Sequence, residues 1–204
     1  MYSGIKILGF HIVASAHQGE ASSVDWSTVN RSEIVSAGWD GLAKVWDAGK
    51  GSVTCTGSYS CNDGTSASGS TSNTSSSSTS TPEFSSSTAS VFKKSGHCYQ
   101  AVFSPHAGNL FGAASGDGGL YVCDTRNFSK TPSLRCHHGS EVLTLDWDKY
   151  QTSEIVTGGV DRHLRVWDIR KPAVPVSVIS DAHALAIRRV KCHPFTPGFA
   201  LSCS

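Results

Sequence analysis

Hydrophobic and polar positions alternate in short runs along most of the chain, and these runs recur in a fixed order. In each unit an alternating segment is followed by an apolar triplet that leads through small residues to an Asp, and a strand-like run then ends at a second Asp. The triplet segments span 34–40, 111–117 and 155–161. Short β-branched and aromatic runs separated by Gly, Asp and Asn are typical of β-strands. The pattern therefore predicts an all-β chain.

The spacing of the units predicts their architecture. Asp117 and Asp161 are 44 residues apart, within the period of about 40–45 residues of a four-stranded propeller blade. Asp40 and Asp117 are 77 residues apart, which is one period plus an insertion. Because closed propellers have about 4–8 blades, we expect a partial β-propeller with three complete blades and the start of a fourth, cut from or shortened relative to a longer protein. The expected blade units are about 17–56, 97–135, 138–180 and 183–204.

The insertion is a tract rich in Ser and Thr, at about 57–90. Such a tract has too little apolar surface to offset the entropy lost when the chain becomes ordered, and we therefore expect it to be disordered. Either 53–56 or 90–92 supplies the outer strand of the first blade, and the sequence leaves both alternatives open.

Composition excludes several classes of function. The formal net charge is +1, from 17 Lys and Arg against 16 Asp and Glu, so nucleic acid and anionic membranes are not the expected main partners. Seven cysteines without a CxxC pair are typical of reduced thiols in an intracellular protein. The His- and Cys-containing segments 136–138 and 192–193 lack the spacing of a structural zinc site, so we expect neither a metal nor another cofactor. At the N-terminus, the apolar run at 5–8 is interpreted as an outer strand rather than as part of a secretory signal.

These units resemble WD repeats, in which a buried His, a Ser or Thr, the turn Asp and a Trp form a hydrogen-bonded set within each blade. The second blade departs from this pattern, with Ala113 and Cys123 in place of the hydroxyl and the indole, and we expect it to be the least stable complete unit. Because the polar residues recur as a structural set and no G-x-S-x-G elbow is present, the chain is not expected to be an enzyme. The residues assigned to the set are His17, Ser36, Asp40 and Trp46, then His97 and Asp117, then His138, Thr157, Asp161 and Trp167, and finally His183.

A closer resemblance is to the family of import receptors for the type-two, N-terminal peroxisomal targeting signal. It is carried by the ordered segments 36–40, 114–117 and 156–161, and above all by the sequence Ala-Ile-Arg-Arg-Val-Lys at 186–191. The resemblance implies a non-enzymatic cytosolic receptor that binds a short N-terminal helix of its cargo proteins. It also implies a co-receptor peroxin as partner and travel between the cytoplasm and the peroxisomal matrix.

The signal that such receptors bind is amphipathic and carries a basic residue, so we expect acidic side chains beside an apolar groove on one face. Glu20 and Glu141, just before the first strand of their blades, are the candidates for the cargo's basic residue. Trp39 is the candidate apolar contact, with packing on its own blade as the alternative. Arg188 is assigned to the same entry position of the fourth blade, where it either steers acidic partners or pairs with Glu141.

Two other functions stay open. The sequence Trp-Asp-Ile-Arg at 167–170 fits the box by which WD-repeat substrate receptors dock on the adaptor of cullin-type ubiquitin ligases. A generic scaffold for protein interactions is the third alternative.

Overall fold

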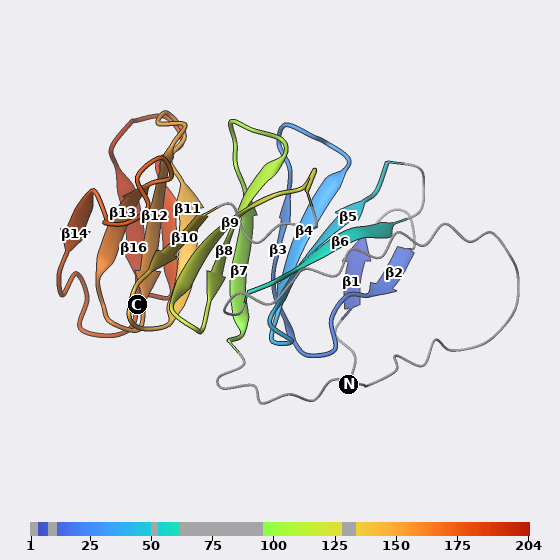
Figure 1. The fold of residues 1–204 in the computed structure, drawn as a ribbon, viewed down its shortest axis with the longest axis horizontal. Coiled ribbons are helices and arrows are strands. Elements are labelled where there is room, and N and C mark those ends of the chain that lie inside the picture. Colours follow the sequence, from blue (N-terminus) through green and yellow to red (C-terminus); the bar gives the residue numbers. More distant parts are fainter. Residues whose placement is uncertain (1–3, 8–11, 50–52, 62–95, 128–133) are drawn as a thin grey trace, which may run out of the picture.

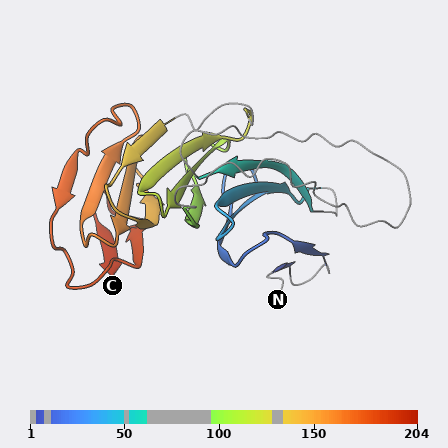
Figure 2. The same ribbon diagram turned by 60° about the horizontal axis from the view of Figure 1, so that its bottom comes forward.

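The structure of the protein is a computed structural model. It describes residues 4–7, 12–49, 53–61, 96–127 and 134–204. Within these ranges the regular structure consists of strands, arranged as three four-stranded and two two-stranded antiparallel sheets. The sheets stand side by side along a curved row (Figures 1 and 2). Nowhere in this part of the chain is there a helix long and apolar enough to cross a bilayer. The predicted all-β class and partial propeller architecture are confirmed.

The first blade shows which segment supplies its outer strand. Strand β6 pairs with β5 in the blade, so the alternative at 53–56 is correct in position, although β6 continues to Ser60 and thus into the predicted insertion. The competing segment 90–92 and the Ser/Thr-rich tract from residue 62 lie outside the described residues. The strands of this blade, in their order in the sheet, are β3 (Ala21–Trp26), β4 (Glu33–Gly38), β5 (Leu42–Asp47) and β6 (Thr54–Ser60).

The second and third blades repeat this order, and a hairpin begins the fourth. The second blade contains β7 (Cys98–Phe103), β8 (Leu110–Ser115), β9 (Gly119–Asp124) and β10 (Leu134–His137). The third contains β11 (Val142–Trp147), β12 (Glu154–Gly159), β13 (Leu164–Asp168) and β14 (Ser177–Ile179). The hairpin consists of β15 (Arg189–Cys192) and β16 (Ala200–Cys203).

The N-terminal segment forms a separate hairpin of β1 (Gly4–Ile7) and β2 (Ile12–Ser15). A strand was predicted at 5–8, and a strand is present, but β1 pairs only with β2 among the described strands. The predicted strand that leads into the first blade is therefore present, as half of this hairpin.

The core lies between neighbouring blades, because each sheet is apolar on both faces. Between the first and second blades, Val45 and Tyr59 belong to one buried cluster with Phe111. Trp147 and Leu120 belong to the cluster that joins the second and third blades. Every interior sheet thus buries both faces, which explains the near-continuous apolar runs of strands such as β8 and β12.

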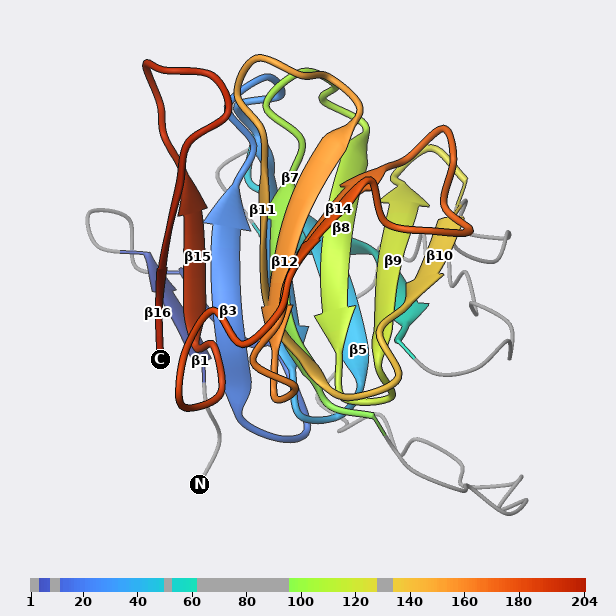
Figure 3. The same cartoon turned by 90° about the vertical axis from the view of Figure 1, so that its left-hand side faces the viewer.

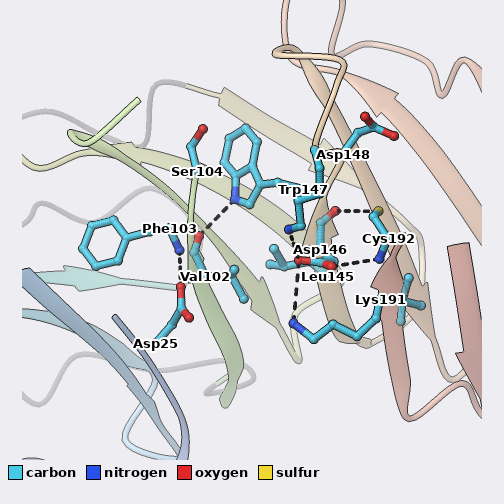
Figure 4. A network of polar contacts seen from close by, with 12 residues as sticks. Asp25, Val102, Phe103, Ser104, Leu145, Asp146, Trp147, Asp148, Lys191 and Cys192 are labelled. Atoms are coloured by element: carbon cyan, nitrogen blue, oxygen red, sulfur yellow. Dashed lines mark hydrogen bonds and ion pairs between the residues drawn. The ribbon is translucent and has the colours of Figure 1, made fainter. Parts of the chain in front are cut away.

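The first strands of the blades, β3, β7, β11 and β15, follow one another around the inner side of the row and gather towards one side in Figure 3. Side-chain oxygens of each strand accept a backbone N–H of the next. We call these contacts the inter-blade clasps, and Figure 4 shows those made by Asp25 and Asp146. The clasps form two rows, and the upper row uses the residue two positions before the lower one in each strand. In the upper row, backbone amides donate to side-chain oxygens: Ala101 N to Ser23 Oγ at 2.9 Å, Leu145 N to Gln100 Oε1 at 3.1 Å and Val190 N to Thr144 Oγ1 at 3.1 Å. The lower row joins Asp25 to Phe103 N and Asp146 to Cys192 N, both at 2.8 Å, with the Trp147 indole donating to the Val102 carbonyl between them.

Candidate functional site

In the first blade the four residues assigned to the structural set form a continuous chain of hydrogen bonds. The Trp46 indole donates to Ser36 Oγ at 2.9 Å, and Ser36 Oγ lies 2.8 Å from His17 Nε2. His17 Nδ1 lies 2.9 Å from the Asp40 carboxylate. Since a carboxylate only accepts, Nδ1 carries the proton and Nε2 accepts from the serine hydroxyl. A Cβ at position 38 would lie 2.4 Å from His17 Nδ1, so the turn requires Gly38.

This blade contains the Asp, His and Ser of a hydrolase triad, but the serine hydroxyl is not accessible to a substrate. Ser36 has no exposed surface, and its oxygen already accepts the Trp46 indole. Burial acts to raise the pKa of Asp40, but the hydrogen bonds from His17 and from the backbone amides of Gln18 and Leu42 outweigh it, and the pKa is lowered. The chain of bonds therefore stabilises the turn and leaves no room for a substrate at the hydroxyl.

The third blade contains the same residue types with one addition. His138 Nε2 lies 2.7 Å from Thr157 Oγ1, which also accepts the Trp167 indole at 2.8 Å. On the other side, the Arg165 guanidinium contacts both His138 Nδ1 and the Asp161 carboxylate. The arginine thus bridges the histidine and the turn Asp. In the fourth unit, His183 Nε2 lies 2.8 Å from Ser202 Oγ.

In the second blade the assignment of His97 to this set is wrong. Asp117 instead accepts the Tyr121 hydroxyl and the Gly119 amide, the latter at 2.8 Å. The His97 Nδ1 lies 2.8 Å from the backbone carbonyl of Trp39, in the preceding blade. The sequence carried a signal for this difference, because the His and the hydroxyl residue are 19 positions apart in the other units, whereas His97 and Ala113 are 16 apart.

His97 is the counterpart of Glu20 and Glu141. The carbonyls of Glu20, His97 and Glu141 each accept the amide of their own blade's turn, from Trp39, Gly116 and Val160, at 2.8–3.0 Å. The three side chains therefore occupy the same position in successive blades, at the end of the sheets where the turn Asps lie. Glu20 and Glu141 are both exposed.

Aromatic side chains connect these positions into one surface, which we call the turn-face row and define as Trp39, His97, Tyr99 and Glu141. The rings of Trp39 and His97 are 5.1 Å apart between centroids, and those of His97 and Tyr99 are 6.0 Å apart. The Tyr99 hydroxyl donates to Glu141 Oε2 at 3.1 Å. Trp39 keeps 46% of its surface exposed while it contacts the next blade. The row offers an apolar aromatic shelf that ends at a carboxylate.

Arg188 occupies a different position from the one predicted. The clasp from Thr144 to Val190 aligns β15 with β11 so that Ala186, not Arg188, corresponds to Glu141. Arg188 corresponds to Tyr99, and its positive charge lowers the Tyr99 pKa against the larger effect of burial, which raises it. Across the described residues, Glu141 makes no ion pair with Arg188 and is bonded to Tyr99 instead.

The Trp-Asp-Ile-Arg segment at 167–170 is held within its own blade. The Arg170 guanidinium donates to both oxygens of Asp168, at 3.0 and 2.8 Å, and this bonding lowers the Asp168 pKa to about 2. Arg126 and Asp124 repeat the arrangement in the second blade. The arginine is therefore a repeated blade feature and not a feature particular to one docking surface.

Comparison with known proteins identifies the repeat. The model of the WD domain, G-beta repeat, matches residues 10–47 and 128–168, which include strands β2 to β5 and β10 to β13. The chain contains WD repeats. Proteins of this class are interaction scaffolds, and the WD-repeat chain is 30% identical over 92% of its length to the peroxisomal targeting signal 2 receptor of Saccharomyces cerevisiae.

Other relatives of the WD-repeat chain support the same resemblance and mark its limit. The peroxisomal targeting signal 2 receptor of Schizosaccharomyces pombe is 25% identical over 86% of the chain, and the ribosome biogenesis protein WDR12 homolog of Oryza sativa is 29% identical over 87%. The resemblance to receptors for this signal is thus confirmed. The chain spans 54% of the Saccharomyces cerevisiae receptor and 45% of the Schizosaccharomyces pombe one, about half the length of each.

Proposed function

We propose that the protein containing this chain is a non-enzymatic receptor that binds the N-terminal, type-two peroxisomal targeting signal of cargo proteins. The turn-face row is the observation that carries the proposal. It combines the exposed face of Trp39 with His97 and Tyr99, and it ends at the exposed carboxylate of Glu141. An amphipathic helix with a basic residue matches this surface, because its apolar side fits the aromatic rings and its cation fits the carboxylate.

Glu20 adds a second carboxylate beside Trp39, since the Glu20 carbonyl accepts the Trp39 amide at 2.9 Å. An isolated exposed ion pair contributes at most about 1 kcal/mol, so removal of one carboxylate should have a small effect, whereas replacement of both by cations loses two attractions and adds two repulsions. We propose that the receptor works with a co-receptor peroxin and cycles between the cytoplasm and the peroxisomal matrix. This part of the proposal rests on the similarity to the peroxisomal targeting signal 2 receptors.

The experiment is a titration of the full-length protein with a cargo signal peptide. The double variant Glu20→Lys with Glu141→Lys is expected to abolish measurable binding, because both carboxylates are then replaced by cations that repel the basic residue. The control is Glu154→Lys, a reversal at the start of β12, at the other end of the third blade. Unchanged peptide affinity in the double variant, with folding intact by circular dichroism, removes the assignment.

The alternative as a receptor of a cullin-type ligase is less well supported, since Arg170 is bonded to Asp168 in its own blade. Co-purification separates the two functions. Recovery of the ligase adaptor that depends on Arg170 favours the ligase, whereas recovery of cargo that depends on the cargo's N-terminus favours the import receptor. Failure of both leaves the generic scaffold.

A further inference from the structure

The inter-blade clasps change at the fourth unit. In the first three blades the upper clasp position holds an oxygen acceptor, Ser23, Gln100 or Thr144, and each accepts an amide of the next strand. The same alignment assigns Arg189 to this position in β15. Arginine has five donors and no acceptor, so Arg189 is unable to make a clasp of this kind.

The lower clasp position changes in the same way. Asp25 and Asp146 accept backbone amides, but the equivalent residue in β15 is Lys191, which also has no acceptor. Figure 4 shows Lys191 directed towards Asp146, with Nζ at 3.7 Å from the carboxylate. Asp146 already has a second cation, Lys149, at 3.1 Å. Two donor-only side chains thus replace two acceptors at successive levels of the inner wall.

Arg189 and Lys191 line a pocket of about 290 Å³ between the inner strands β3, β7 and β15. Opposite them lie Ser23, Asp25 and Gln100. The Arg189 guanidinium has no hydrogen bond or ion pair to any described residue, and its side chain is exposed. An arginine without a carboxylate partner, in a concave site, is available to bind an anion.

Gln100 gives an independent indication of a ligand. The side chain is 95% buried, since only 5% of its surface is exposed, and its Oε1 accepts the Leu145 amide at 3.1 Å. Its Nε2 group donates to no atom of the described residues, yet Gln100 lines the pocket. The Ser23 oxygen accepts the Ala101 amide, which leaves its hydroxyl proton to donate as well. The pocket therefore presents donors from two walls.

The charges indicate which anion fits. Arg189 and Lys191 contribute two positive charges to the lining and Asp25 one negative charge, which leaves one positive charge in excess. A carboxylate carries one negative charge, whereas a phosphate monoester carries nearly two near neutral pH and would oppose Asp25. The planar guanidinium also matches a carboxylate with two parallel hydrogen bonds.

We propose that this inner-strand pocket binds a carboxylate group, held by the Arg189 guanidinium and the Gln100 amide, with Lys191 and the Ser23 hydroxyl beside them. The carboxylate comes either from a small free acid or from an acidic side chain of a bound protein segment. The pocket lies on the inner strands and uses none of the residues of the turn-face row, so this site is independent of the proposed cargo site.

The test is isothermal titration of the full-length protein with three probes: propionate, an acetylated and amidated Gly-Glu-Gly peptide, and inorganic phosphate. Arg189→Gln is expected to weaken carboxylate binding by about ten-fold or more, the effect of losing one charge-assisted hydrogen bond. Lys191→Gln is expected to have a smaller effect, because Lys191 shares its charge with Asp146. Arg126→Gln is the matched control, since Arg126 is bonded to Asp124 outside the pocket.

Tighter binding of propionate than of the peptide identifies a free acid as the source of the carboxylate, and the reverse order identifies a protein side chain. Tighter binding of phosphate than of either carboxylate overturns the ligand class. No binding of either carboxylate, or equal binding by the Arg189→Gln variant, overturns the site. In the wild-type protein, the NMR signals of the Gln100 side-chain amide should shift on addition of propionate, a readout that requires no variant to fold.

Discussion

The first and second blades stabilise the same turn with different side chains. In the first, Trp46, Ser36 and His17 form a chain of hydrogen bonds that ends at Asp40. In the second, the Tyr121 hydroxyl donates directly to Asp117, with no histidine between them. In both blades the turn Asp therefore accepts a hydrogen bond from a side chain of the blade interior, and this donor need not be a histidine.

The comparison also explains why a histidine lies in the turn-face row. Because Tyr121 supplies the donor, the second blade does not use His97 in its interior, and His97 instead contacts Trp39 and Tyr99 at the surface. The second blade therefore lacks the buried histidine of the first blade and instead has a histidine at the surface, in the turn-face row.

The largest expected effect comes from Ser36→Ala in the first blade, which imitates Ala113 of the second. The substitution leaves the His17 ring and the Trp46 indole without their shared partner in a fully buried site. An unsatisfied buried polar group costs about 1–3 kcal/mol, so the free energy of unfolding should fall by about 2–4 kcal/mol in urea denaturation of the full-length protein. Ser180→Ala, the same substitution at an exposed position, is the control, with an expected change within about 0.5 kcal/mol. Equal effects of the two variants would contradict the role of the network.

A smaller loss is expected from Tyr121→Phe in the second blade. The variant removes the hydroxyl that donates to Asp117 and keeps the ring, which is 1% exposed. One hydrogen bond to a charged group contributes about 1.5–3 kcal/mol, and Asp117 retains the Gly119 amide, so we expect a loss of about 1–2 kcal/mol in the same assay. Tyr150→Phe, at an exposed position, should change little. A Tyr121→Phe protein as stable as wild type would show that the tyrosine does not replace the histidine.

The pH dependence of stability should give the smallest difference. The pKa of Asp40 is lowered in the folded protein, so its ionised form stabilises the fold above the unfolded pKa of about 3.9. This contribution is lost as the pH falls from about 4 through the folded pKa. Asp40→Asn should therefore flatten the decline of the urea midpoint below pH 4, whereas Ser36→Ala, which retains the contact between His17 and Asp40, should keep it. The same slope in Asp40→Asn and wild type would contradict the pKa shift.

The fold could be predicted from the sequence because the repeat records local geometry. The interval between the turn Asps gave the blade period, and the apolar triplets correspond to β4, β8 and β12, which are buried on both faces. The pairing of β1 with β2 could not be read from the chain, because a short apolar run does not specify its partner strand.

The candidate site was only partly predictable. Glu20, Trp39 and Glu141 were identified from their position in the repeat, but Tyr99 was missed because it has no equivalent in the first blade, where Ser22 occupies its position. Arg188 was assigned two residues out of register, since the alignment of β15 with β11 depends on the clasp from Thr144 to Val190. Contacts between blades, unlike those within a repeat, join residues from 45 to 78 positions apart and leave no local pattern.

The most direct test of the proposed function is a charge exchange between receptor and cargo peptide. Glu141→Lys in the full-length protein should weaken binding of the signal peptide, and a peptide in which the basic residue is replaced by Glu should bind wild type poorly. If Glu141 meets this basic residue, the altered peptide and the Glu141→Lys variant should bind each other better than either binds its unaltered partner. If the exchanged pair binds no more tightly than the sum of the two single effects predicts, Glu141 does not meet the cargo's basic residue and the turn-face row is not the cargo site.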